Sequence, residues 1–436
     1  MSFISGVTRC GRHMISRAAG VRHNWQCRQV HFSMLKFVNE KPSVSISSDG
    51  LEFKVSHDKR TLLPNFWLRD NCRCSSCVNQ DTMQRNFNTF DIPDDIQASQ
   101  ITPGEDGVKV KWSGDGHESF YLWEFLEFYL RYNQRPSEYT EYKYFGAQGP
   151  KNNSKHWPPS IKYGDFAVDE TKAVGRLTNF IRRNGFAFVT GVPIESATPT
   201  KTLLEKIAFI RETHYGGFYD FIPDLALADT AYTNLPLGAH TDTTYFTDPA
   251  GLQAFHLLSH TDPSSPDRNE NLGGKSLLVD GFHAGAILRK EDPRAFQILN
   301  RYKLQWHASG NNGITIAPDK LYPVFELEAK TQLMHRIRWN NDDRGVVNFE
   351  SEYQPTGWYQ AARKWHEILT RESMEYWFQL EPGNLLIFDN WRVLHGRSAF
   401  TGVRRICGAY INRDDFISRW RNTNFPRDEV LKRVIG

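Results

Sequence analysis

Two histidines and one aspartate in this chain could together hold a metal ion. One residue separates His240 from Asp242, and the segment that follows them, 243–246, has the composition of a β-strand. Side chains of a strand alternate between its two faces, so a His-x-Asp pair on a strand points to one side. With a distant histidine, the pair would present two imidazoles and a carboxylate to one side of an ion. That arrangement leaves the opposite coordination positions open for redox chemistry, as in non-haem Fe(II) sites.

The same three residue types occur a second time in the chain. His260, Thr261 and Asp262 repeat the pattern, but they run directly into the segment 263–267, which is rich in Pro, Ser and Asp. Such a segment is typical of a solvated loop. We therefore interpret the second copy as surface and not as a metal site.

The distant histidine is predicted to be His395. It follows an apolar, strand-like run at 385–391 and precedes a predicted turn at Gly396. We predict that His240, Asp242 and His395 are the catalytic residues and the iron ligands.

Three of the six cysteines, Cys72, Cys74 and Cys77, lie within six residues. Three thiolates need one more ligand to complete the tetrahedral coordination of a structural zinc ion. The spacing therefore predicts a zinc site with its fourth ligand elsewhere in the chain. Free thiols and a disulfide are the alternatives, and a reducing compartment disfavours the disulfide.

The composition excludes several classes of protein. The chain has 436 residues, of which 39% are hydrophobic and 24% charged, as in globular proteins. No run approaches the ~18 apolar residues of a membrane span. A balance of 53 basic against 50 acidic residues is too small for a nucleic-acid footprint. We expect neither a nucleic acid nor a membrane as a partner.

The first 39 residues differ from the rest in charge. The segment 1–39 contains six basic and no acidic side chains, interleaved with hydroxyl residues and without a long apolar run. This composition is typical of a mitochondrial transit peptide and predicts location in the mitochondrial matrix. A disordered basic tail is the alternative.

The remainder divides into three predicted parts. Strand-like alternation at 42–56 and around 108–123 predicts a small β-rich domain over 40–145, and a loop-like segment predicts a linker at 146–164. From 165 to 436, helical periodicity comes first and many short strands follow. We predict a mainly β fold with covering helices, in which 165–436 form a double-stranded β-helix, or jelly roll.

The segment 383–397, GNLLIFDNWRVLHGR, resembles the distal-histidine strand of the 2-oxoglutarate-dependent, taurine-dioxygenase-like oxygenases. The resemblance implies Fe(II) as cofactor, and 2-oxoglutarate and O₂ as co-substrates. It also implies that an arginine after this strand binds the far carboxylate of 2-oxoglutarate. Arg404 is the better match, and Arg405 is the alternative. Ser276 falls where the family places a hydroxyl on the same carboxylate.

A narrower resemblance covers residues from about 50 to about 425. The segment WLRDNCRCSSC at 67–77 and the region 210–246 are similar to the γ-butyrobetaine dioxygenase family, which hydroxylates quaternary ammonium compounds in carnitine biosynthesis. This resemblance implies that His117 is the fourth zinc ligand. It further implies ascorbate as a reductant and a homodimer.

The same family resemblance implies a substrate site built from aromatic side chains. Tyr215, Tyr219, Tyr232 and Tyr410 fall at its positions, and Asp229 adds a carboxylate. A quaternary ammonium group cannot donate hydrogen bonds, so aromatic ring faces are its natural partners. Tyr219 stands where the family usually has tryptophan.

The reaction that the resemblance implies is hydroxylation of N6,N6,N6-trimethyllysine at C3, the first step of carnitine biosynthesis, with release of succinate and CO₂. Hydroxylation of γ-butyrobetaine, the last step, is the first alternative; Asp229 and the presequence count against it. A non-catalytic protein that binds a trimethylammonium group is the second, and the complete ligand set counts against that.

Overall fold

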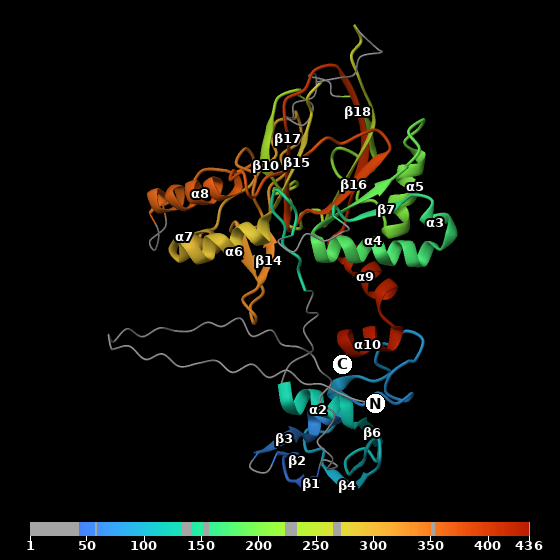
Figure 1. Ribbon diagram of the computed structural model, residues 1–436. Coiled ribbons are helices and arrows are strands. Elements are labelled where there is room, and N and C mark those ends of the chain that lie inside the picture. Colours follow the sequence, from blue (N-terminus) through green and yellow to red (C-terminus); the bar gives the residue numbers. More distant parts are fainter. Residues whose placement is uncertain are drawn as a thin grey trace, which may run out of the picture. The chain divides into compact units, whose positions relative to one another are not determined.

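The computed structural model describes residues 43–56, 59–132, 141–150, 157–222, 233–264, 272–349 and 354–435 (Figure 1). The chain separates into two compact units, 1–134 and 135–436. The predicted presequence lies outside the described residues, as do Asp229 and Tyr232. None of the described helices combines the length and the apolar character that crossing a membrane requires.

The smaller unit contains two three-stranded antiparallel sheets, ordered β1-β2-β3 and β4-β5-β6. Its strands are β1 (Val44–Ser47), β2 (Gly50–Ser56), β3 (Lys59–Pro64), β4 (Ala98–Pro103), β5 (Gly107–Trp112) and β6 (Glu118–Leu122). Its helices are α1 (Asn65–Asp70), the short 3₁₀ turn η1 (Thr89–Asp91) and α2 (Trp123–Tyr132). The strands predicted at 42–56 and around 108–123 are present.

Strand β5 shows why this unit folds as it does. Val108, Val110 and Trp112 are buried, whereas the lysines between them are exposed. The period-two alternation directs the apolar side chains into a core shared with α1 and α2, to which Leu68 and Leu126 contribute.

The larger unit contains two main sheets. One has six strands in the order β7-β8-β16-β11-β18-β9, and the other has four in the order β10-β17-β12-β15. All pairs within them are antiparallel except β7 with β8. The strands are β7 (Ser160–Lys162), β8 (Phe186–Thr190), β9 (Tyr219–Phe221), β10 (Leu237–His240), β11 (Leu252–Thr261), β12 (Ser276–Asp280), β15 (Tyr376–Phe378), β16 (Asn384–Asp389), β17 (Val393–Arg397) and β18 (Val403–Ile411), with the separate pair β13 (Phe325–Leu327) and β14 (Met334–Ile337).

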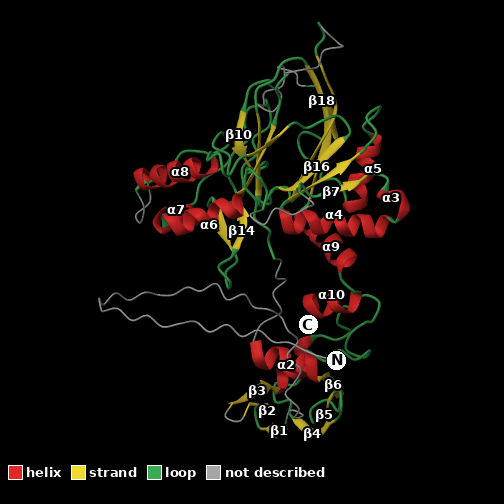
Figure 2. Cartoon of the chain, in the orientation of Figure 1, coloured by secondary structure: helices red, strands yellow, loops and turns green. Residues whose placement is uncertain are grey.

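Helices cover the outer faces of these sheets (Figure 2). They are α3 (Asp165–Val168), α4 (Glu170–Asn184), α5 (Thr198–Ile207), α6 (Gly281–Glu291), α7 (Pro293–Arg301), α8 (Pro355–Leu369) and α9 (Arg413–Asn424). A further helix, α10 (Arg427–Ile435), follows α9 and contacts it. Side chains of α4, α5 and α9 share a core with the six-stranded sheet, and those of α6, α7 and α8 share one with the four-stranded sheet. A third core, which includes Phe388 and Leu278, lies between the two sheets. The prediction of a β fold with covering helices is confirmed at this level.

Asp292 separates α6 from α7. Its side chain accepts from the Ala295 amide and so caps α7, and Pro293 cannot continue α6. One local element differs from the predicted organisation. Strand β7 lies inside the predicted linker 146–164 and pairs with β8 in the larger unit. The division into 40–145, 146–164 and 165–436 stays a prediction of domain organisation.

Candidate functional site

His240, Asp242 and His395 come together in the larger unit. Antiparallel pairing of β10 with β17 places His240 opposite His395. His240 Nε2 lies 3.1 Å and His395 Nε2 3.8 Å from Asp242 Oδ1. The three ligand atoms all lie within 4.8 Å of one another. Ligands about 2.1 Å from a divalent ion and at right angles lie about 3 Å apart, so the set fits a facial metal site.

The local reason for this geometry differs from the predicted one. Strand β10 ends at His240, and Asp242 lies in the loop that follows. Asn390 fixes that loop: its side chain accepts from the Asp242 amide (2.9 Å) and donates to the Asp242 carbonyl (3.0 Å). A tertiary contact therefore brings the carboxylate to the site, and strand alternation alone does not.

The turn predicted at Gly396 is wrong. His395 and Gly396 both lie inside β17, which begins after a tight connection from β16. A Cβ at position 396 would lie 2.6 Å from the Leu237 carbonyl oxygen. Glycine is required here because β10 passes too close for any side chain.

The protonation states of His395 and Asp242 suit a cation, whereas that of His240 depends on its hydrogen bond with Asp242. Burial lowers the pKa of His395 to about 3, so its imidazole is neutral. Burial opposes ionisation of Asp242, but its interactions with His395 and His240 hold its pKa well below the usual range. For His240, burial lowers the pKa, and the hydrogen bond with Asp242 outweighs it and raises the pKa overall. The His240 Nδ1 contacts the Gly238 carbonyl (2.8 Å), which leaves Nε2 directed at the site.

Two further side chains contact the Asp242 carboxylate. Gln253 Nε2 and the Tyr410 hydroxyl each donate to Asp242 Oδ2 at 2.6 Å. Gln253 did not stand out in the sequence; its one distinguishing feature is that it is a polar residue within the buried strand β11. Tyr410 was predicted to face the substrate, and its ring does line the cavity described next, but its hydroxyl is used by the metal ligand.

The metal ligands line a cavity of about 620 Å³ in the larger unit. Several other residues singled out in the sequence also line it: Ser276, Arg404, Tyr215, Tyr219 and Tyr410. Predicted residues that are up to 195 positions apart in the sequence thus line one concave surface, which is where a small-molecule site is expected.

Arg404 and Arg405 point in opposite directions from β18. Arg404 is 4% exposed and lines the cavity, and its Nε has no hydrogen-bond partner among the described residues. Burial, with the charge of Arg397, lowers the pKa of Arg404 to about 9. Arg405 is exposed to solvent and pairs with Asp220 at 2.9 and 2.6 Å. Of these two arginines, Arg404 is the one placed to bind an anion in the cavity.

Tyr219 and Tyr410 form part of an aromatic wall. Their rings pack edge to face, with centroids 6.0 Å apart, and Phe255 lies 6.2 Å from Tyr219. The Tyr219 hydroxyl donates to the Ala254 carbonyl (2.6 Å), which fixes the ring. Held in this way, the wall presents aromatic surface that can attract a cation.

The repeated pattern at His260 begins on a strand and not in the loop that follows it. Strand β11 continues to Thr261, so His260 lies on a strand, half-buried, and its Nε2 contacts the Thr401 carbonyl (2.8 Å). Asp262 instead accepts from the Ser264 amide and hydroxyl. The described residues contain no third ligand near this pair, so the repeat is not a metal site.

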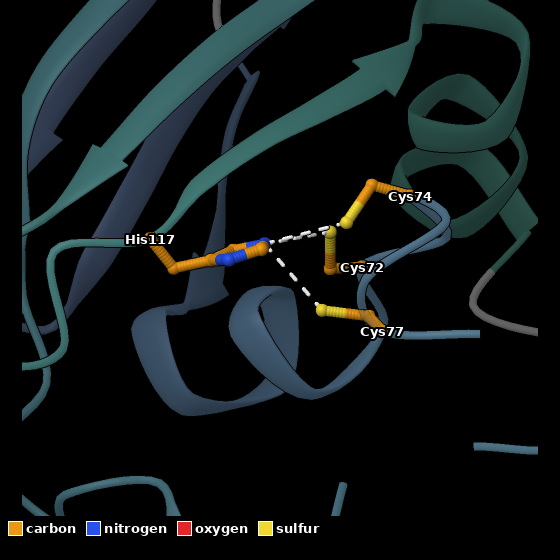
Figure 3. A group of neighbouring side chains, drawn as sticks. All are labelled: Cys72, Cys74, Cys77 and His117. Carbon is orange, nitrogen blue, oxygen red and sulfur yellow. Dashed lines mark hydrogen bonds between the residues drawn. The ribbon is translucent and has the colours of Figure 1, made fainter. Parts of the chain in front are cut away.

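The cysteine cluster lies in the smaller unit (Figure 3). The sulfurs of Cys72, Cys74 and Cys77 lie 3.4, 3.6 and 3.4 Å from His117 Nε2. Zinc–sulfur and zinc–nitrogen bonds of about 2.3 and 2.0 Å at tetrahedral angles separate sulfur from nitrogen by about 3.5 Å. The four side chains therefore fit a closed zinc site without rearrangement.

Two charged residues that the sequence did not single out support this cluster. Arg69 donates to Cys77 Sγ (3.4 Å) and to Asp115 (2.7 Å), and Asp115 in turn accepts from the His117 amide (3.0 Å). Burial and the neighbouring Cys72 raise the pKa of the Cys77 thiol to about 12. A divalent ion would stabilise the thiolates that this burial disfavours.

Comparisons with known proteins agree with this division. The family described as "Taurine catabolism dioxygenase TauD, TfdA family" matches residues 141–410, and "Gamma-butyrobetaine hydroxylase-like, N-terminal" matches residues 43–127.

Curated relatives match over most of their length. A Neurospora crassa protein named trimethyllysine dioxygenase is 57% identical, over 91% of this chain and 88% of its own. A Meyerozyma guilliermondii protein of the same name is 37% identical, over 92% and 100%. The human protein named mitochondrial trimethyllysine dioxygenase is 36% identical, over 81% of each chain.

Proposed function

Because this chain belongs to the taurine catabolism dioxygenase TauD, TfdA family, we propose that it is an Fe(II)- and 2-oxoglutarate-dependent dioxygenase that hydroxylates N6,N6,N6-trimethyllysine at C3. The reaction consumes O₂ and 2-oxoglutarate and releases succinate and CO₂. The observation that carries the proposal is one cavity lined by all three potential metal ligands, by the buried Arg404 and by several tyrosines. The names of the relatives support the choice of substrate.

In this proposal His240, Asp242 and His395 hold Fe(II). The bound ion would supply the redox chemistry that activates O₂ on its open side. The protein directs that side to the cavity, because all three ligands also line it. The ionised Asp242 and neutral His395 are already in the protonation states that bind a cation.

Arg404 and Ser276 hold 2-oxoglutarate. A guanidinium can bind a carboxylate through two parallel hydrogen bonds, and these are strongest where water is excluded. Arg404 is buried, and Ser276 begins β12 on the same cavity wall. Together they anchor the far carboxylate of the co-substrate, so that its other end reaches the metal.

The trimethylammonium group binds among Tyr215, Tyr219 and Tyr410, together with Tyr232 and Asp229, which lie outside the described residues. Each ring face attracts the cation by about 0.5–2 kcal/mol. The distance between this aromatic site and the metal then selects the carbon that reacts, which is a positioning effect.

The remaining parts of the proposal concern architecture and location. The two main sheets of the larger unit form the double-stranded β-helix of the family, and the cysteine cluster with His117 holds a structural zinc ion. The enzyme acts as a homodimer in the mitochondrial matrix, in the first step of carnitine biosynthesis. Ascorbate keeps the iron reduced. Relatives named as mitochondrial, together with the basic segment 1–39, support the location.

The experiment is substrate-dependent succinate formation by the Fe(II)-loaded protein, with trimethyllysine and γ-butyrobetaine compared. We expect one oxygen to be added to trimethyllysine and little reaction with γ-butyrobetaine. The reverse preference would move the enzyme to the last step of the pathway. Binding of trimethyllysine without any turnover would favour a non-catalytic binding protein.

A further inference from the structure

Two side chains that are not metal ligands hold the same oxygen of the Asp242 carboxylate. Gln253 on β11 and Tyr410 on β18 both donate to Oδ2, at 2.6 Å each. Oδ1 lies on the other side, 3.1 Å from His240 Nε2. The two strands are neighbours in the six-stranded sheet, and their register pairs Gln253 directly with Tyr410.

This arrangement limits how the carboxylate can bind a metal. A carboxylate oxygen has about two lone-pair sites, and two donors occupy those of Oδ2. Oδ1 is left as the oxygen that faces the two imidazoles. An Asp242 held in this way can ligate an ion through one oxygen but not through both.

We propose that Gln253 is a positioning residue that, with Tyr410, keeps Asp242 a monodentate ligand. The inference rests on the proposed function, because it concerns the same iron site. Its consequence is one additional open coordination position on the ion. With that position open, 2-oxoglutarate and O₂ can bind the same ion together. A bidentate Asp242 would fill that position.

The environment of Gln253 indicates that packing does not explain it. The side chain is 2% exposed, in a strand whose neighbours Leu252 and Ala254 are also buried. Its Oε1 is buried and has no hydrogen-bond partner among the described residues. An apolar side chain would avoid that unsatisfied oxygen, so a role limited to packing would not favour glutamine here. The carboxylate also sets the direction of the amide, since a flipped amide would place Oε1 against Oδ2.

Tyr410 extends the arrangement to the substrate. Its ring lines the cavity, whereas its hydroxyl holds the metal ligand. A cation bound against this ring would therefore contact a side chain that is hydrogen-bonded to Asp242.

The test measures metal binding and not turnover. Gln253→Met keeps the length of the side chain and removes the N–H donor, and Tyr410→Phe removes only the hydroxyl. The dissociation constant for Mn(II) is followed by the electron paramagnetic resonance signal of the free ion. We expect each variant to bind Mn(II) about 10- to 100-fold more weakly, the usual effect of removing a partner of a metal ligand. Water-proton relaxation should show one fewer Mn(II)-bound water than in the unchanged protein.

The matched control is Gln305→Met, which removes a glutamine whose Nε2 donates to the Trp306 carbonyl (3.2 Å). Its Mn(II) affinity should be unchanged. The thermal midpoint of the protein without Mn(II) should be lowered no more by Gln253→Met than by this control. A lowered midpoint with unchanged Mn(II) affinity would mean a structural role and would overturn the inference.

Failure of the inference can be told apart from failure of the proposed function. If the unchanged protein binds Mn(II), and the dissociation constants of both variants lie within twofold of its value, Gln253 and Tyr410 do not position Asp242. If the unchanged protein binds no Mn(II), the metal site itself is wrong. Should Gln253→Met not fold, Tyr410→Phe decides the question alone.

Discussion

The two metal-ligand groups of this chain differ in how completely they would enclose an ion. In the smaller unit, Cys72, Cys74, Cys77 and His117 form a closed tetrahedral set, and Arg69 donates a hydrogen bond to one of its sulfurs. In the larger unit, three ligands lie on one side and the opposite side faces a cavity of about 620 Å³. A closed set stabilises a fold, whereas an open set leaves room for reactants.

The two groups also differ in how the chain assembles them. Three of the four cysteine-cluster ligands lie on one short loop, so local geometry brings them together. The ligands His240 and His395 meet only because β10 and β17 pair. Local geometry therefore assembles most of the smaller-unit group, whereas strand pairing assembles the larger-unit group.

The largest expected effect is at the open site. His240→Ala should abolish turnover, a loss of at least about 100-fold, because even partners of metal ligands matter to that extent. His260→Ala, at the repeated pattern, should leave Mn(II) binding unchanged. Succinate formation and Mn(II) affinity measure the two effects. Loss of Mn(II) binding in both variants would mean that the wrong pair was chosen.

At the closed site the expected loss is of structure. Cys77→Ser, or removal of zinc by a chelator, should expose 43–132 to protease, because structural zinc contributes about 10–16 kcal/mol in isolated zinc modules. The larger unit, 141–435, should remain resistant and retain its Mn(II) site. Zinc content and fragment masses measure this. A variant with full zinc content would contradict the closed site.

A smaller effect is expected at the co-substrate arginine. Arg404→Met should raise the KM for 2-oxoglutarate about 10- to 100-fold, since hydrogen bonds to a charged group contribute about 1.5–3 kcal/mol. Arg405→Met removes only a solvent-exposed ion pair with Asp220 and should change this KM little. Equal KM values for the two variants would exclude Arg404 from the site.

A change of a few-fold is expected at the aromatic wall. Tyr219→Trp should lower the KM for trimethyllysine about two- to fivefold, because the indole face attracts cations more strongly. The KM for 2-oxoglutarate should stay the same. If both KM values rise together, the larger ring has disturbed the cavity and Tyr219 does not act on the cation alone.

The last prediction concerns a buried histidine that binds no metal, and its effect is confined to acid pH. Burial lowers the pKa of His256 to about 4, from a usual value of 6.5. The unfolded chain therefore binds a proton between these values and the folded chain does not, so stability falls as the pH drops from 6.5 to about 4. The loss can reach about 3 kcal/mol.

Unfolding by denaturant across this pH range measures the loss. His256→Gln should have a shallower dependence on pH than the unchanged protein. Identical slopes would show that other groups cause the acid sensitivity.

Much of the molecule could be predicted from local sequence patterns. Period-two alternation predicts the strand 384–389 and the opposite directions of the Arg404 and Arg405 side chains. The helix that ends at Gly185 follows from glycine's access to positive φ, which is 89° there. The cysteine cluster is equally local, since its spacing alone indicates a metal site.

What the sequence did not reveal depends on contacts between distant segments. Gln253 is one of several polar residues in strand β11, and only the sheet register places it beside Tyr410 and the loop of Asp242. His260 repeats the metal motif in letters, yet no third ligand comes near it among the described residues. Residue types and spacing along the chain determine which side chains could bind a metal. Only the tertiary structure decides which of them converge, because strand pairing and loop anchoring act between residues that are far apart in the sequence.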